Sequence, residues 1–241
     1  MTGSLIYPRR GLHGEVVHTI GLQIVSGELQ PGDPLPPEDE LTSNLSVSRT
    51  VLREAVRVLA AKGLVQARPK TGTRVRERSE WNMLDPDVLS WRTERFHDLK
   101  LYEETTEVRL AIEPLAARLA ATRATRDDVA GIAAAFAAME AGLDDQGAYL
   151  AGDLDFHTRI LGSCHNEVLE QLGRVLRAVL GATFALTTTP GRSRRRALPL
   201  HRAILDGIVA RNEEAAEEAA KTLIADTARD IRRLAGRSGR P

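Results

Sequence analysis

A chain of 241 residues is long for one domain and suits two, because single domains usually contain about 100 to 150 residues. Its composition, 42% hydrophobic and 27% charged, is ordinary for a globular protein, and no apolar run approaches the roughly 20 residues that span a membrane. The single cysteine, Cys164, cannot form a disulfide within the chain, and the N-terminus has no apolar segment of signal-peptide length. We therefore expect a cytoplasmic protein rather than a membrane or secreted one.

The formal net charge of zero hides an uneven distribution along the chain. Residues 47–78 contain nine basic residues and two acidic ones, a local charge of +7. A charge run is most often a solvated face, but such an excess also suits the phosphate backbone of nucleic acid. The helical spacing of the arginines in this segment favours double-stranded DNA as the partner.

Three helices are predicted in the first part of the chain: over residues 12–26, over residues 37–44, and from a hydroxyl N-cap within Ser46-Val47-Ser48 to Gly63. Three arginines recur every four residues along the third helix, on the face opposite its apolar stripe. These are Arg49, Arg53 and Arg57. The second and third helices therefore form a helix-turn-helix in which one face packs and the other can read a DNA groove.

Two short strands follow, over residues 64–68 and 73–76, where apolar and polar residues alternate on either side of a turn. Gly72 in this turn lets the backbone approach a phosphate or the minor groove closely, and Lys70 and Arg74 flank it. A helix-turn-helix followed by such a hairpin is a winged helix.

The runs LPPEDEL, SVSRTVLREAVRVLAAKGLV and GTRV, in this order, resemble the winged helix of the GntR family of bacterial regulators over residues 10–77. The resemblance implies a set of DNA-contacting residues: Ser48, Arg49, Thr50, Arg53, Arg57, Lys70, Gly72, Thr73 and Arg74. The family often has arginine where this chain has Asp39, so a DNA contact from that position is not carried over and the operator can differ.

Residues 79–97 are predicted to be a linker helix region between two domains, residues 1–78 and 98–241. Both tryptophans of the chain lie in this region, ten residues apart in the run WNMLDPDVLSW. Two large aromatic residues at such a place are usually packing anchors, so we expect them to fix one domain against the other.

From about residue 98 the strand patterns end and alanine-rich helical periodicity begins. The predicted helices lie near residues 99–122, 126–142, 146–163, 166–187, 194–211 and 213–235. The fold class is therefore mostly α: an N-terminal winged helix-turn-helix plus a C-terminal all-helical bundle.

Two polar residues of this bundle, Asp153 and His157, stand four residues apart and so share one helical face, while His201 lies on a later helix. Each alone is more often a hydrogen-bonded core residue than a ligand. The runs around them resemble the ligand-binding (FCD) domain of the FadR subfamily within the GntR family, and the three match its metal motif. The resemblance implies a divalent metal ion, with zinc favoured by the imidazole ligands. A further histidine of the usual members aligns with Leu223, so the site is one protein ligand short.

Two further residues match positions around the effector in this subfamily. Arg109 matches the arginine that meets the effector's carboxylate, and a guanidinium offers a fixed fork to such a group. A salt bridge to Glu113, one turn along, is an equally good explanation. Asn166 matches a position at the pocket edge, although it can instead cap the helix that begins at Glu167.

The linker run and the segment AAEEAAKTLIADT resemble regulators of sugar-acid (D-galactonate) catabolism within this subfamily. The resemblance implies a homodimeric repressor that leaves its operator when a small carboxylic (aldonic) acid binds, and it implies no enzyme. Two alternatives stay open: a metal-dependent hydrolase that uses Asp153, His157 and His201, and a lactate or acyl sensor on the same fold. The first is weakened because no general base accompanies the triad, the second by the triad and the linker.

Overall fold

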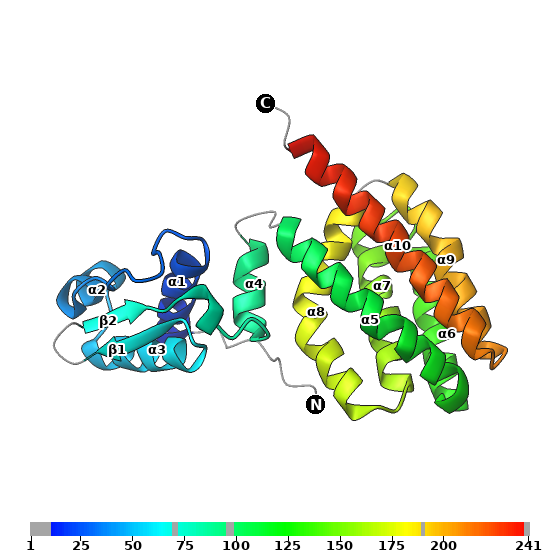
Figure 1. The fold of residues 1–241 in the computed structure, drawn as a ribbon, viewed down its shortest axis with the longest axis horizontal. Helices are drawn as coiled ribbons and strands as arrows, with labels where there is room; N and C mark the ends of the chain where they lie inside the picture. Colours follow the sequence, from blue (N-terminus) through cyan, green and yellow to red (C-terminus); the bar gives the residue numbers. More distant parts are fainter. Residues whose placement is uncertain (1–10, 69–71, 95–98, 189–190, 239–241) are drawn as a thin grey trace. The chain divides into compact units, whose positions relative to one another are not determined.

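The computed structural model describes residues 11–68, 72–94, 99–188 and 191–238 of the chain (Figure 1). The chain divides into two compact units, Met1–His97 and Asp98–Pro241, and each is described by itself below. Helices dominate both units, and the described part of the chain has one sheet, of two strands. The predicted fold class, mostly α with a winged helix followed by a helical bundle, is confirmed.

The N-terminal unit contains the predicted helix-turn-helix and wing. Its elements are α1 (Leu12–Val25), α2 (Glu38–Leu45), α3 (Arg49–Ala61), β1 (Val65–Arg68) and β2 (Gly72–Val75). The Ser48 hydroxyl caps α3 by accepting a hydrogen bond from the Val51 amide at 3.3 Å. The two strands pair antiparallel with Val65 opposite Val75, and the side chains of both are buried in a core built on α1 and α3. The wing is thus fixed to the helices that carry the recognition face.

The segment predicted as a linker packs on this same unit, where it forms a short 3₁₀ helix, η1 (Arg78–Glu80), and helix α4 (Pro86–Glu94). Trp81 and Trp91 both belong to the N-terminal core. The Trp91 indole donates to Nδ1 of His18 at 2.9 Å and lies where a side chain at Gly21 would have to sit, so glycine is required in α1 at that point.

Buried ion pairs also join the residue that follows α3 to the start of α4. The Lys62 ammonium lies 3.0 Å from the Asp85 carboxylate and 2.5 Å from that of Asp87. Burial lowers the pKa of Lys62, but the hydrogen bonds and charges of these two carboxylates outweigh it, so the pKa is raised. Helix α4 is therefore attached to the end of α3 by charge and to α1 by Trp91.

The C-terminal unit is a bundle of helices. They are α5 (Leu99–Arg123), α6 (Arg126–Ala141), α7 (Gln146–Ser163), α8 (Glu167–Thr188), α9 (Gly191–Val209) and α10 (Glu213–Ser238). Helix α7 packs against α5, α6 and α8, while α10 packs against α5 and α9. Helix α9 begins three residues before its predicted start, and the other starts agree within one residue.

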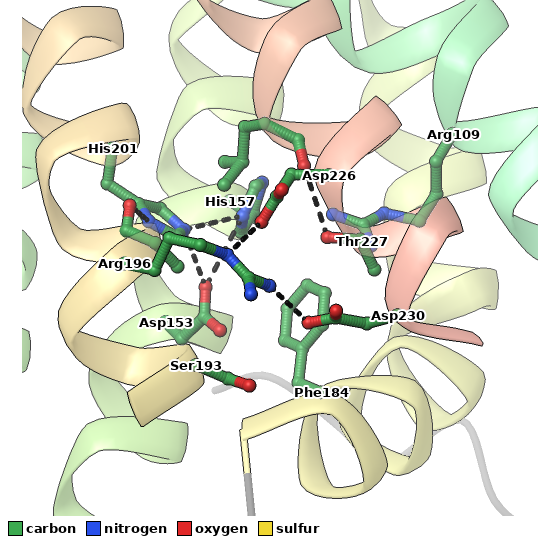
Figure 2. Close-up of a pocket in the computed structure, with 12 residues that line it drawn as sticks. Arg109, Asp153, His157, Phe184, Ser193, Arg196, His201, Asp226, Thr227 and Asp230 are labelled. Carbon is green, nitrogen blue, oxygen red and sulfur yellow. Dashed lines mark hydrogen bonds and ion pairs between the residues drawn. The ribbon is translucent and has the colours of Figure 1, made fainter. Parts of the chain in front are cut away.

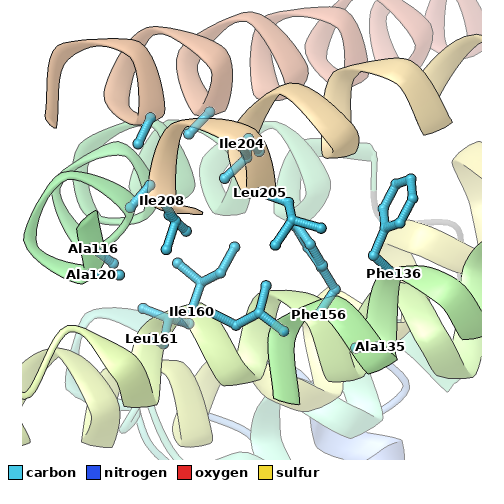
Figure 3. Packing of buried hydrophobic residues seen from close by; sticks show 14 of the residues in the cluster. Ala116, Ala120, Ala135, Phe136, Phe156, Ile160, Leu161, Ile204, Leu205 and Ile208 are labelled. Atoms are coloured by element: carbon cyan, nitrogen blue, oxygen red, sulfur yellow. The ribbon is translucent and has the colours of Figure 1, made fainter. Parts of the chain in front are cut away.

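Apolar side chains of α9 face those of α7 across the middle of the bundle, as Figure 3 shows for Ile204 and Ile208 opposite Phe156 and Ile160. Alanines of α5, among them Ala116, complete this core and let the helices approach closely. Helix α7 is thereby held rigidly, together with the polar residues that it carries. Within the described residues, no helix is long and apolar enough to cross a membrane.

Candidate functional site

Helix α3 presents the face that the sequence assigns to DNA. Leu52, Ala55 and Leu59 are buried against the core, whereas the arginines of the opposite face are exposed. The side chains of Arg49 and Arg53 are 64% and 67% exposed. The predicted division of this helix into a packing face and a free face is therefore present.

Acidic residues contact these arginines in the DNA-free chain. Arg49 Nη2 lies 2.7 Å from Asp39 Oδ1, and Arg53 Nε lies 3.3 Å from the Glu38 carboxylate, both acids being on α2. Such exposed ion pairs contribute little to stability, about 0–1 kcal/mol, so phosphates can replace the carboxylates. Asp39, which the sequence comparison singled out as a departure, thus contacts Arg49 directly.

The rest of the predicted DNA-contacting set divides between the recognition helix and the wing. Thr50 and Arg57 are exposed on α3. Gly72 has a φ of +80°, which glycine adopts without strain, and Arg74 donates to the Gly32 carbonyl at 2.9 Å. Thr73 is partly exposed beside them, whereas Lys70 lies outside the described residues.

The three predicted metal ligands meet inside the C-terminal unit, and all are at most 4% exposed (Figure 2). Nε2 of His157 and Nε2 of His201 are 3.3 Å apart, and Asp153 Oδ1 lies 3.3 Å from the first and 3.0 Å from the second. One ligand atom from each residue therefore converges on a common point. The four-residue spacing predicted this for Asp153 and His157 on α7, and the structure brings His201 on α9 to the same point.

The outer nitrogens of both imidazoles are engaged. His201 Nδ1 donates to the Ala197 carbonyl at 2.9 Å, and His157 Nδ1 lies 2.8 Å from Glu113 Oε2. Because a carbonyl or carboxylate oxygen accepts the Nδ1 proton in each case, both Nε2 lone pairs face Asp153. When the rings are neutral, three acceptors at such distances repel one another unless a cation, a proton or a metal ion, lies between them. Nitrogen and oxygen donors with hydrogen-bonded outer nitrogens are what a divalent metal such as zinc requires, so the residues fit the ion.

The charges of the cluster are strongly coupled. Burial disfavours the charged ring of His157, but Glu113 and Asp153 outweigh it and raise the pKa of His157 to about 9. Burial likewise opposes ionisation of both carboxyls, yet His201 and His157 hold the pKa of Asp153 well below its usual range, and Arg109 and His157 hold that of Glu113 at about 2. The pocket therefore attracts positive charge while its carboxylates stay ionised.

Arg109 is only 1% exposed and makes the salt bridge that the sequence allowed. Its Nε and Nη2 lie 2.6 and 3.3 Å from the two carboxylate oxygens of Glu113, and its guanidinium packs 4.6 Å from the Phe184 ring centroid. Its Nη1 has no hydrogen-bond partner among the described residues. A buried cationic donor without a partner is costly, so this atom is available to a ligand anion.

Arg109 and the three convergent residues line one pocket. Leu223 lines it too, which puts the residue that replaces a family histidine beside the ligand atoms. Further lining residues that sequence reasoning did not find are Phe184, Ser193, Arg196, Ala197, Asp226, Thr227 and Asp230. The last three share one face of α10, but only the packing of α9 against α10 shows that this face meets the pocket.

Asn166 lies elsewhere. Its side-chain oxygen accepts from the amides of Val168 and Leu169 at 3.1 and 3.2 Å, so it caps α8, and it is absent from the lining of the described pocket. Conversely, Glu113, considered from sequence only as a partner of Arg109, also orients His157.

Comparison with known proteins agrees with this architecture. The model of bacterial regulatory proteins of the gntR family matches residues 12–75, and the FCD domain model matches residues 104–226. The galactonate operon transcriptional repressor of Escherichia coli (strain K12) is 39% identical over 91% of this chain and 96% of its own. An uncharacterized HTH-type transcriptional regulator of the same organism, YieP, is 33% identical over 93% of this chain and 97% of its own.

Among solved structures, Lar, which controls expression of the Listeria monocytogenes agr system, is similar over 95% of this chain and 100% of its own. The TM-score is 0.67 at 18% identity, a likeness that shows the fold alone. Because the matched families and the sequence relatives are transcriptional regulators, the hydrolase alternative is wrong. The chain belongs to the GntR family of bacterial regulatory proteins, as a DNA-binding regulator whose second domain is an FCD domain.

Proposed function

We propose that this regulator represses a sugar-acid catabolic operon and leaves its operator when D-galactonate, or a close aldonic acid, binds in the C-terminal pocket. The observation that carries the proposal is the unpartnered Nη1 of Arg109 in the pocket that also holds the three convergent ligand atoms. A guanidinium group beside a metal-binding cluster suits an acid that has further oxygen atoms near its carboxylate. The similarity to the galactonate operon transcriptional repressor of Escherichia coli supports the same class of effector.

In this proposal Asp153, His157 and His201 hold a divalent metal ion, with zinc favoured, and Glu113 and Ala197 orient the two imidazoles. When bound, the ion supplies a Lewis acid that attracts carboxylate and hydroxyl oxygens. Leu223 offers no ligand atom, so an ion held here would have coordination positions left for effector oxygens. Arg109 binds the carboxylate and so orients the acid.

On the DNA side, we propose a homodimer that holds a pseudo-palindromic operator through two copies of α3 and the wing. Coupling between the two domains is reciprocal: an effector that weakens operator binding must bind the DNA-free form more tightly. The proposal is tested by operator release in the presence of D-galactonate, lactate or an acyl-CoA. Release by lactate or acyl-CoA alone would instead support the other sensors on this fold.

The metal site gives a first testable prediction. Wild-type protein should copurify with about one divalent ion per chain, and a chelator should remove it, because only three protein ligands hold the ion. The double variant His157→Ala, His201→Ala should lose the ion. Elemental analysis by mass spectrometry measures this directly.

His165→Ala is the matched control, because His165 is an exposed histidine paired with Asp128, outside the pocket. It should retain the ion. A double variant that melts cooperatively and keeps the wild-type metal content would rule out this site.

A further inference from the structure

A second polar group lines the effector pocket besides Arg109 and the metal-binding cluster. Asp226, Thr227 and Asp230, here named the α10 wall, lie on one face of α10. Arg196 reaches them from α9: its Nε donates to Asp226 Oδ2 at 2.8 Å, and its Nη2 donates to Asp230 Oδ2 (Figure 2). One guanidinium therefore fixes both carboxylates at the pocket.

The α10 wall still has unused hydrogen-bond acceptors. The other oxygen of Asp226 accepts from Arg229 at 2.8 Å, and the other oxygen of Asp230 lies 3.4 Å from Arg233. An ionised carboxylate has about four acceptor positions, and these bonds use two on each residue. Thr227 donates to the Leu223 carbonyl at 3.2 Å, so its oxygen is free to accept. A ligand group that faces this wall must therefore be a donor.

The charge at this wall distinguishes between kinds of donor. Arg196, Arg229 and Arg233 set three guanidinium groups against the carboxylates of Asp226 and Asp230. Burial raises the pKa of Asp226, but the hydrogen bonds from Arg229 and Arg196 outweigh it, and the pKa is lowered. Because the carboxylates are already neutralised, the wall does not attract an ammonium group. Neutral hydroxyl groups are the donors that fit.

The buried, unpartnered Nη1 of Arg109 independently indicates a ligand in this same pocket, and an anionic one. A molecule that satisfies both features carries a carboxylate and several hydroxyl groups.

We propose that Asp226, Thr227 and Asp230, positioned by Arg196, select the effector by its hydroxyl groups, so that the pocket distinguishes polyhydroxylated carboxylic acids from short or apolar ones. This inference rests on the proposed function, because it assigns specificity to the same pocket. Arg109 and the metal recognise the acid, and the α10 wall recognises the rest of the molecule.

Isothermal titration calorimetry on the full chain tests this with D-galactonate, lactate, hexanoate and 6-aminohexanoate. Wild type should bind D-galactonate at least about tenfold more tightly than the other three acids. The reason is that each hydrogen bond from a ligand hydroxyl group to a charged carboxylate adds substantially to the affinity. In the double variant Asp226→Asn, Asp230→Asn the affinity for D-galactonate should fall about tenfold, while that for lactate changes less than about twofold. Thr227→Val should weaken D-galactonate binding in the same selective way.

The matched control is Asp206→Asn, which removes an aspartate paired with Arg202 on the exposed side of α9 and should change nothing. Equal losses for D-galactonate and lactate in the double variant would show a merely structural role and overturn the inference. So would unchanged D-galactonate affinity in both variants, or tighter binding of 6-aminohexanoate by wild type. If wild type binds none of the acids, the proposed function itself fails.

Discussion

Arg49→Ala and Arg53→Ala should each weaken specific operator binding strongly while the fold is retained. Each lost base contact costs about 1–3 kcal/mol, which is roughly 5- to 150-fold in affinity. The fold should tolerate both changes, because these arginines are exposed and their pairs with Asp39 and Glu38 contribute little to stability. Band-shift titration with circular dichroism of the same samples measures both effects.

Arg159→Ala is the control for this experiment, since Arg159 is an exposed arginine of α7 in the other unit, paired with Asp155. It should bind the operator as wild type does. Wild-type affinity in both Arg49→Ala and Arg53→Ala would end the assignment of α3 as the recognition helix.

Arg109→Ala should convert the protein into a super-repressor that binds its operator normally but no longer responds to D-galactonate. Shifting a population from 99:1 to 1:99 requires about 5.5 kcal/mol of differential binding, more than the roughly 1.5–3 kcal/mol of one charge-assisted hydrogen bond. The arginine and the metal are therefore both needed. Fluorescence anisotropy of labelled operator DNA follows the release.

Two further variants control for the loss of the buried pair with Glu113. Arg109→Lys keeps the positive charge but loses the paired N–H donors of the guanidinium, so it should release the operator only at a higher effector concentration. Arg118→Ala removes an exposed arginine of the same helix, paired with Glu213 and Glu217, and should respond normally. A normal response by Arg109→Ala would remove this residue from the effector site.

The sequence predicted those features that depend on one helix at a time. The four-residue spacing of Arg49, Arg53 and Arg57 fixed a shared face of α3, and that of Asp153 and His157 fixed a shared face of α7. The third ligand, His201, was found through the family resemblance, because no periodicity connects α7 with α9.

What the sequence could not predict are contacts between elements. Glu113 has a clear partner one turn away in Arg109, and its contact with His157 depends on the packing of α5 against α7. The bonds from Arg196 to Asp226 and Asp230 likewise cross from α9 to α10. Helical periodicity says which residues share a face, but not which helix that face will meet.

The most direct test of the central claim is the anisotropy of the operator complex titrated with D-galactonate before and after metal removal. Metal-loaded protein should release the DNA, chelated protein should bind DNA but fail to release it, and added zinc should restore the response. Release by acyl-CoA but by no hydroxy acid, or a normal D-galactonate response after verified metal removal, would contradict the account.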